Sequence, residues 1–218
     1  MCTRNYNGYG VRDNFPLRDM SLSEFKHLLD PVLPHPKFML SLCGTYGDPA
    51  ANKNCTEILE YVHTVYPHVE IIMSSNASMK TPAWWAKLAE FTNLKIEFAL
   101  DGLADTHSIY RQNTNWHKII ENATAYIDAG GFAIWQFIKF DHNKHQLEQC
   151  KQMSKDIGFA EFKHFDDNRA NGLAFTPDGD PFVLGTPSEE ITSVMQFVEQ
   201  EKYLQRQYEL NLQEEYVR

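Results

Sequence analysis

Polar residues that could bind a ligand follow three predicted strands of the chain. Asp48 lies in the glycine- and proline-containing loop after the apolar run 38–44, and its carboxylate can accept hydrogen bonds from a ligand ammonium group. Ser75 and Asn76 end the next apolar run, and Asp101 ends the one after it, where its carboxylate could bind a ribose or another polyol. Each side chain has an equally good structural interpretation, because Asp, Ser and Asn commonly cap turns and helices.

Two segments further along the chain offer other chemistry. Gln136 is the only polar side chain in the stretch 132–138, so it either faces a ligand or finds a hydrogen-bond partner in the neighbouring backbone. Asp141, His142 and His145 are a combination that could hold a metal ion, although the same segment is typical of a polar helix start.

An alternation of strand and helix patterns positions these residues. Strands are expected over 38–44, 69–75, 94–102, 132–140 and 159–165. Helices are expected over 21–31, 55–66, 81–91, 115–131 and 143–158. A capping box at Ser21–Glu24 is expected to begin the first helix, and Thr81 is expected to be the N-cap of the third. Asn143 and Gln146 are expected to cap the last helix. This alternation predicts an α/β fold with a parallel sheet, whose ligands bind at the carboxyl ends of the strands.

Composition excludes several classes of protein. The 218 residues carry a net charge of −9, which argues against a broad basic surface for nucleic acid. Four irregularly spaced cysteines do not form a disulfide framework, and they contain no CxxC pair. The polar start does not resemble a signal peptide, and no apolar run approaches the ~20 residues of a membrane span. We therefore expect a soluble cytoplasmic protein with no membrane or nucleic-acid partner.

The C-terminal part of the chain has a different character from the rest. The stretch 168–187 contains three prolines and three glycines without helical periodicity, which predicts a loop or linker. Residues 188–218 are charged and are expected to form a last helix that leads toward a further domain.

Four segments, taken in order, resemble one enzyme family. These are "CTRNYNG" (2–8), "GTYGDP" (44–49), "SSNAS" (74–78) and "ALDGLADTHSIYR" (99–111). They are similar to the end of the CxxxCxxC cluster loop, the GGEP-type loop, the TNG-like turn and the S-[IL]-D-G…H…YR segment of radical S-adenosylmethionine (radical SAM) enzymes. The resemblance covers most of residues 1–167, and it is strongest to the branch that often carries a SPASM-type C-terminal domain.

The resemblance implies a fold, two cofactors and a reaction. The fold would be a partial (β/α)6 TIM-like barrel of parallel strands with its first strand missing. The cofactors would be a [4Fe-4S] cluster and S-adenosylmethionine, which together supply a 5′-deoxyadenosyl radical for hydrogen abstraction. The partners would be a peptide or small-molecule substrate and an electron donor such as flavodoxin or ferredoxin.

The resemblance also assigns roles to individual residues. Cys2 would be the third cysteine ligand of the cluster. The cofactor-binding residues would come from the strand ends: Gly47 and Asp48 near the methionine amino group, Ser75, Asn76 and Asp101 near the ribose or methionine moiety, and Arg111 at the carboxylate, with Pro49 and Gln136 as further cofactor contacts.

Departures from the family pattern limit what the resemblance implies. Two cluster cysteines and the first strand would fall before Met1, Asp48 replaces the usual glutamate, and Ala99 replaces a serine. We therefore expect a fragment truncated at both ends that is inactive alone. Two alternatives stay open: Cys43 and Cys55 replace the missing ligands, or the chain is a non-catalytic module that binds a ligand or partner.

Overall fold

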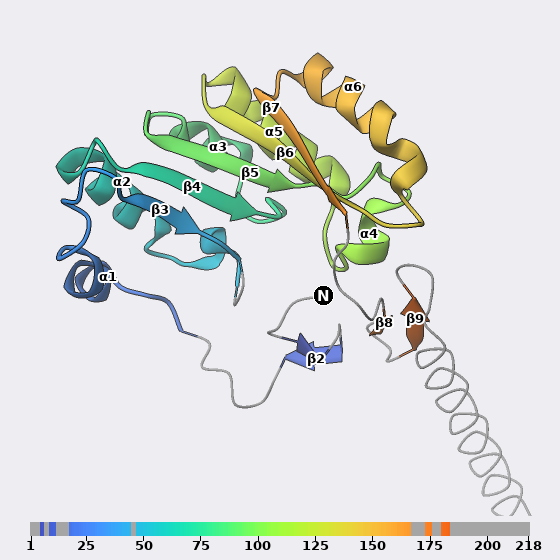
Figure 1. The fold of residues 1–218 in the computed structure, drawn as a ribbon, viewed down its shortest axis with the longest axis horizontal. Helices are drawn as coiled ribbons and strands as arrows, with labels where there is room; N and C mark the ends of the chain where they lie inside the picture. Colours follow the sequence, from blue (N-terminus) through green and yellow to red (C-terminus); the bar gives the residue numbers. More distant parts are fainter. Residues whose placement is uncertain are drawn as a thin grey trace, which may run out of the picture.

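The centre of the protein is a five-stranded parallel sheet (Figure 1). The computed structural model describes residues 5–6, 9–11, 18–44, 47–166, 173–175 and 180–183. The strands follow one another in both sequence and space: β3 (Met39–Leu42), β4 (Glu70–Ser75), β5 (Leu94–Ala99), β6 (Phe132–Lys139) and β7 (Glu161–Asp166). The parallel α/β fold expected from the sequence is confirmed.

Helices connect the strands in regular alternation. They are α1 (Leu22–Leu29), α2 (Cys55–Val65), α3 (Pro82–Leu88), α5 (Trp116–Asp128) and α6 (Leu147–Ile157), with the shorter η1 (Pro49–Ala51), α4 (His107–Tyr110) and η2 (Lys144–Gln146). The capping box at Ser21 and Glu24 is present, and the Thr81 side chain accepts a hydrogen bond from the Trp84 amide. Both predicted N-caps are confirmed.

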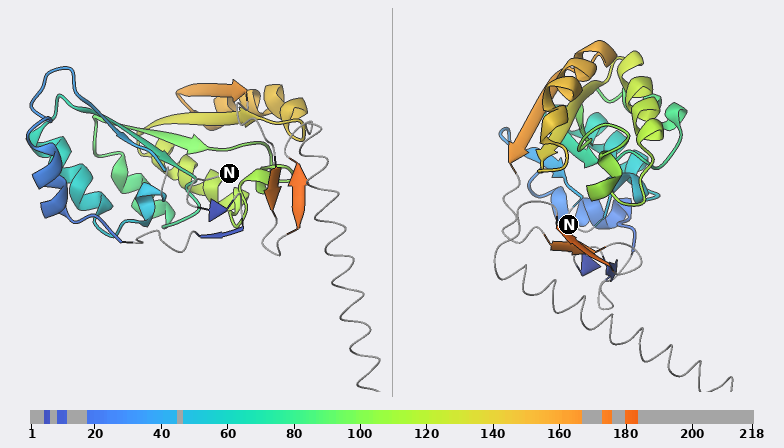
Figure 2. Two further views of the ribbon diagram at one scale, coloured as in Figure 1. Left: turned by 60° about the horizontal axis from the view of Figure 1, so that its bottom comes forward. Right: turned by 90° about the vertical axis from the view of Figure 1, so that its right-hand side faces the viewer.

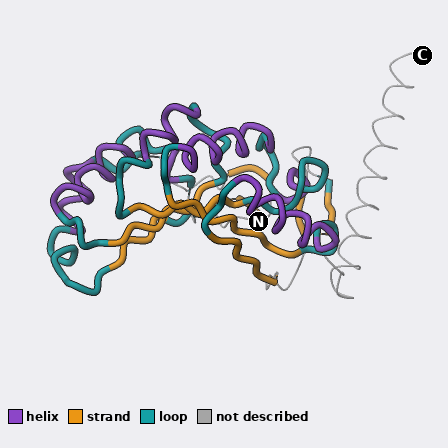
Figure 3. The backbone as a smooth tube through the Cα atoms, turned by 90° about the horizontal axis from the view of Figure 1, so that it is seen from above, coloured by secondary structure: helices purple, strands orange, loops and turns teal. Residues whose placement is uncertain are grey.

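The helices lie along one face of the sheet. Parallel strands in sequential order need crossovers of one hand, which place every connecting helix on the same side. Figure 3 shows the sheet arched, with the helices along its outer side. Side chains on that side are buried, including Ile71, Met73 and Phe98, whereas Ser74 and Glu97 on the opposite side are only partly buried. The inner side of the arch is the open face of the sheet.

Large aromatic side chains fill the layer between sheet and helices. Trp85, Phe98, Tyr126 and Trp135 are fully buried. The polar atoms of this group are satisfied by backbone, since Trp135 Nε1 donates to the Leu100 carbonyl at 2.9 Å. This layer supports the sheet from behind and leaves the open face and the strand ends for polar residues.

Two other small sheets lie outside the main one. β1 (Asn5–Tyr6) pairs with β2 (Tyr9–Val11), and β8 (Leu173–Phe175) pairs with β9 (Pro181–Val183), both antiparallel (Figure 2). The stretch 168–187, expected to be a loop, therefore contains a strand pair. The helix expected over 188–218 lies outside the described residues.

The predicted caps of α6 were wrong. Neither Asn143 nor Gln146 makes a side-chain capping bond, and a 3-10 turn precedes α6. The Asn143 side chain instead accepts from the Phe140 amide and donates to the carbonyls of Asp101 and Ile138. The Asn143 amide therefore links the residue after β5 to the end of β6. Within the described part of the chain, no helix is long and apolar enough to span a membrane.

Candidate functional site

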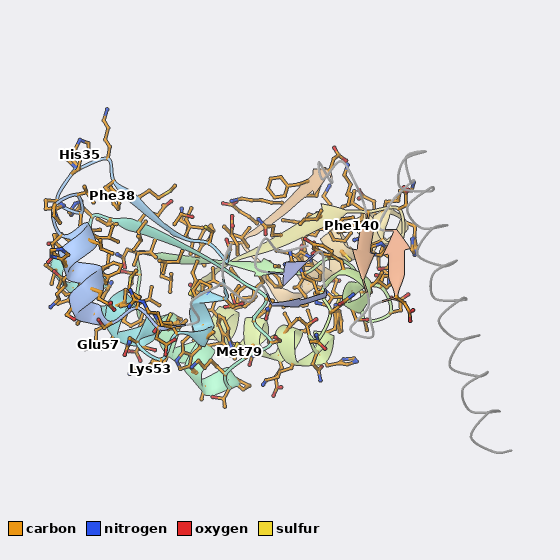
Figure 4. All side chains as sticks on the ribbon, turned by 90° about the horizontal axis from the view of Figure 1, so that it is seen from below. His35, Phe38, Lys53, Glu57, Met79 and Phe140 are labelled. Atoms are coloured by element: carbon orange, nitrogen blue, oxygen red, sulfur yellow. The ribbon has the colours of Figure 1, made fainter. Side chains whose placement is uncertain are left out.

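The polar residues singled out in the sequence gather at the carboxyl ends of β3, β4, β5 and β6. Parallel strands bring these ends to one edge of the sheet. Figure 4 shows Phe140, which follows β6, far from His35 and Phe38, which precede β3 at the opposite end. The edge carries two groups of interacting residues, one centred on Asp48 and the other on Asp101.

Asp48 joins the loop after β3 to the loop after β4. Its carboxylate accepts hydrogen bonds from the Ala50 amide at 2.9 Å, the Ser75 hydroxyl at 2.8 Å and the Asn76 amide at 2.8 Å. Asp48 also caps the short helix η1, which begins at Pro49. The structure thus brings together residues that the sequence places 27 positions apart, and the Ser75 hydroxyl lies within hydrogen-bond distance of both oxygens of the half-buried carboxylate.

Asp101 joins three segments through all of its polar groups. Its side chain is fully buried; Oδ1 accepts from the Ile138 amide and Oδ2 from Arg111 Nε, both at 2.6 Å. Its amide donates to His107 Nδ1, and its carbonyl accepts from Asn143 Nδ2, both at 3.2 Å. Asp101 therefore links the end of β5 to helix α4 and to the end of β6.

Arg111 presents the accessible part of this second group. Its side chain is 24% exposed, and its guanidinium lies 4.9 Å from the centre of the Tyr110 ring. Because Nε is used by Asp101, the two terminal NH2 groups remain, and they have no partner among the described residues. A planar donor pair of this kind matches a carboxylate.

His107 is fully buried, and its carbonyl accepts a hydrogen bond from the Arg111 amide at 2.9 Å. Burial lowers the pKa of its imidazole to about 4, with Asp101 opposing this shift and Arg111 adding to it. Its Nδ1 accepts from Asp101, which places the proton on Nε2, and Nε2 has no partner in the described part of the protein. His107 is therefore a neutral hydrogen-bond acceptor that supports the Asp101 backbone.

The open face of the sheet carries a polar row next to this edge. Glu97 accepts from the Ser74 hydroxyl at 2.9 Å and pairs with Lys163 at 3.3 Å. Gln136 lies in register with Ala99 on one side and Lys163 on the other, and its half-buried amide has no hydrogen bond to any described residue. The ligand-facing interpretation of Gln136 stays a prediction, while its partnership with neighbouring backbone is not observed.

Solved structures provide the comparison with known proteins. No protein-family model matches the chain, and no curated protein is similar to it. Streptococcus suis SuiB bound to S-adenosylmethionine matches with a TM-score of 0.61 and 11% identity over 76% of this chain and 39% of SuiB. SuiB bound to the precursor peptide SuiA matches with a TM-score of 0.63 and 11% identity, over 91% of this chain and 42% of SuiB. The enzyme anSMEcpe with bound AdoMet matches with a TM-score of 0.60 and 13% identity, over 80% of this chain and 47% of anSMEcpe.

SuiB and anSMEcpe are radical SAM enzymes. The chain has their partial-barrel fold. It spans less than half the length of each of these neighbours. This partial-barrel fold agrees with the fold that the sequence motifs implied, and the Asp48 and Asp101 groups lie at the carboxyl edge of its sheet.

The described residues do not provide the ligands of a [4Fe-4S] cluster. Cys2, the predicted ligand, lies outside them. Cys55 and Cys150 are buried, and burial raises the pKa of each thiol to about 12, so neither is a ready thiolate. Cys43 is exposed, but within residues 18–44 and 47–166 no three Cys, His, Asp or Glu side chains converge. The replacement of missing ligands by Cys43 and Cys55 stays a hypothesis, because it also needs Cys2, which lies outside the described residues.

The metal hypothesis for Asp141, His142 and His145 was wrong. The His142 ring stacks on Phe140 with centroids 5.2 Å apart, and Asp141 pairs with Lys144 at 2.7 Å. No metal-binding group is found in the described parts of the chain, which include all three of these residues. The segment is the polar turn that leads into α6.

Sequence reasoning missed three members of the Asp101 group. His107 lay in a motif but was given no role, Asn143 was assigned to a helix cap, and Gln146 accepts from the Leu103 amide at 2.9 Å and from Thr106. A signal for His107 was available, because it precedes Arg111 by four residues and so shares its helical side. No local signal pointed Asn143 or Gln146 toward a loop about 40 residues earlier.

Replacing Ser75 with alanine is expected to lower the free energy of unfolding by about 1–3 kcal/mol, because a buried donor to the Asp48 carboxylate is lost. Ser74→Ala is the matched control: this serine also donates to a carboxylate, Glu97, but it is only half-buried on the open face. Ser74→Ala should therefore lower the free energy of unfolding by less than about 1 kcal/mol. Urea denaturation measures both variants, and equal losses would contradict the structural role of the Asp48 group.

Proposed function

We propose that this chain binds S-adenosylmethionine at the carboxyl ends of β3–β6, as the barrel portion of a radical SAM enzyme. The observation that carries the proposal is the Arg111 donor pair, fixed at the same carboxyl edge of the sheet as the Asp48 group, in a fold shared with solved radical SAM enzymes. In this proposal Asp48 and Gly47 receive the methionine amino group, and Arg111 receives the carboxylate.

The charge of the edge supports this ligand over a nucleotide phosphate. Asp48 and Asp101 contribute two negative charges and Arg111 one positive charge, so the three together carry −1. S-adenosylmethionine carries a sulfonium, an ammonium and a carboxylate at neutral pH, and is therefore a net cation. A polyanionic phosphate chain would meet two carboxylates at this edge and only one guanidinium.

Bound in such a fold with a reduced [4Fe-4S] cluster, S-adenosylmethionine supplies a radical for hydrogen abstraction. The described residues of this chain do not supply three thiolates. The proposal therefore covers cofactor binding by this chain and does not extend to radical formation by it. A non-catalytic module that retains the cofactor site is the alternative.

A peptide is the substrate class that we propose for the complete enzyme. One support is the SuiB neighbour, which has been seen with its precursor peptide SuiA. The other is the open face of the sheet, where the Gln136 amide offers both a donor and an acceptor beside the paired charges of Glu97 and Lys163. A peptide group needs both kinds of partner.

Calorimetric titration of the chain with S-adenosylmethionine tests the proposal. The wild-type chain is expected to bind, and Arg111→Gln is expected to weaken binding by about tenfold or more, or about 1.4 kcal/mol, because the ligand carboxylate loses its donor pair. Arg18→Gln is the matched control, since Arg18 also pairs with a carboxylate, Glu24, but is exposed beside α1. Wild-type affinity in Arg111→Gln, or no binding by the wild type, would contradict the proposal.

A further inference from the structure

The Asp101 carboxylate has no free direction toward a ligand. It is fully buried, and each oxygen already accepts a 2.6 Å hydrogen bond, one from the Ile138 amide and one from Arg111 Nε. Breaking either bond would leave a buried polar group without its partner. The direct contact with a ribose, expected from the sequence, would therefore require this group to be dismantled, and another role fits the structure better.

The carboxylate acts on the orientation of Arg111. A guanidinium has three edges, and Asp101 occupies the one that carries Nε. The Tyr110 ring lies against it, 4.9 Å from the guanidinium carbon, which restricts rotation of its plane. With one edge and one face held, the remaining pair of NH2 groups points in a single direction. A free arginine side chain would lose rotamer entropy on binding an anion, and this one has already lost much of it.

The support of Asp101 is itself rigid. Its carboxylate is anchored to β6 through Ile138, its amide to His107 and its carbonyl to Asn143. His107 and Asn143 are both fully buried. Through Asp101, the Arg111 side chain is thus anchored to the sheet as well as to the short helix α4 that precedes it.

We propose that Asp101 is a positioning residue, which orients Arg111 so that the site selects ligands with a carboxylate. The inference rests on the proposed binding of S-adenosylmethionine and adds the origin of its selectivity. Asp101 touches no ligand atom in this proposal. Its effect is confined to the part of the ligand that Arg111 contacts, and this separates it from a general role in folding.

Two ligands that differ by one group test the proposal. Decarboxylated S-adenosylmethionine keeps the adenosine, sulfonium and ammonium and lacks only the carboxylate. The wild-type chain is expected to prefer S-adenosylmethionine by about tenfold or more. Asp101→Asn is expected to reduce this preference to about threefold or less, with the affinity for the decarboxylated ligand changed by less than about threefold. If Asp101→Asn acted only by removing a negative charge, it would weaken binding of the decarboxylated ligand more than binding of S-adenosylmethionine, because the decarboxylated ligand is the more cationic of the two. The preference for S-adenosylmethionine would then increase, which is the opposite result.

A double-mutant cycle gives a second readout. If Asp101 acts only through Arg111, then Asp101→Asn combined with Arg111→Gln binds S-adenosylmethionine no more weakly than Arg111→Gln alone. If Asp101→Asn does not fold, as judged by circular dichroism, Arg111→Lys replaces it. Lysine keeps the charge but lacks the planar fork that Asp101 orients, so the same loss of preference is expected.

The outcomes separate the two proposals. Equal weakening of both ligands by Asp101→Asn, additive losses in the cycle, or an undiminished preference in Arg111→Lys would overturn the positioning role. No binding of either ligand by the wild-type chain would instead overturn the proposed cofactor site itself.

Discussion

Replacing Gly102 with alanine is expected to lower the free energy of unfolding by about 3 kcal/mol or more. Gly102 follows Asp101 with φ at +120°, a conformation that side chains rarely adopt. A Cβ there would lie 2.1 Å from Thr106 Oγ1 and 3.1 Å from Gln146 Oε1, inside the hydrogen-bonded loop after β5. The loop must therefore shift, and the Gly102 carbonyl would move away from Trp116 Nε1.

Gly130→Ala is the control for this variant. Gly130 also has a positive φ, at +91°, but a Cβ on it would meet nothing within 4 Å. Its replacement should cost only backbone strain, about 1 kcal/mol. Urea denaturation compares the two, and equal losses would show that the packing around residue 102 is looser than the structure indicates.

Stability is expected to fall by about 3 kcal/mol between pH 7 and pH 4 because of His107. Its pKa is lowered from 6.5 to about 4 in the folded protein by burial. Between these values the unfolded chain binds the proton and the folded chain does not, so acid favours unfolding. This contribution is complete above pH 6.5 and is lost by about pH 4. Protonation of Nδ1 would also remove the acceptor of the Asp101 amide.

His107→Gln isolates this contribution. The variant is less stable at pH 7, but it lacks the titrating group, so its unfolding free energy should vary less between pH 7 and pH 4 than that of the wild type. Urea denaturation at intervals of half a pH unit gives both curves. Parallel curves for the two proteins would contradict a buried neutral His107.

The convergence of Asp48, Ser75 and Asn76 could be predicted from the sequence, because parallel strands bring their carboxyl ends to one edge. The strands and the caps at Ser21 and Thr81 could be predicted for a similar reason, since each depends on residues close together in the chain. Local pattern and a single topological rule were sufficient for these features.

The roles within the Asp101 group could not be predicted in this way. The partner of one Asp101 oxygen is the backbone amide of Ile138, 37 residues later, and every residue type except proline offers such an amide. Asn143 resembles a helix cap in sequence, yet its side chain bonds the backbone of Asp101, Ile138 and Phe140. Whether a buried carboxylate faces a ligand or an internal donor depends on tertiary packing, which periodicity does not reveal.

Amide chemical shifts of the isotopically labelled chain, titrated with S-adenosylmethionine, test the central claim most directly. We expect saturable changes at the strand ends, in 47–50, 75–78, 101–111 and 136–139, with the outer helices α1 and α2 unchanged beyond their contacts with these loops. Changes centred on the outer helices, or no change at saturating ligand, would contradict it.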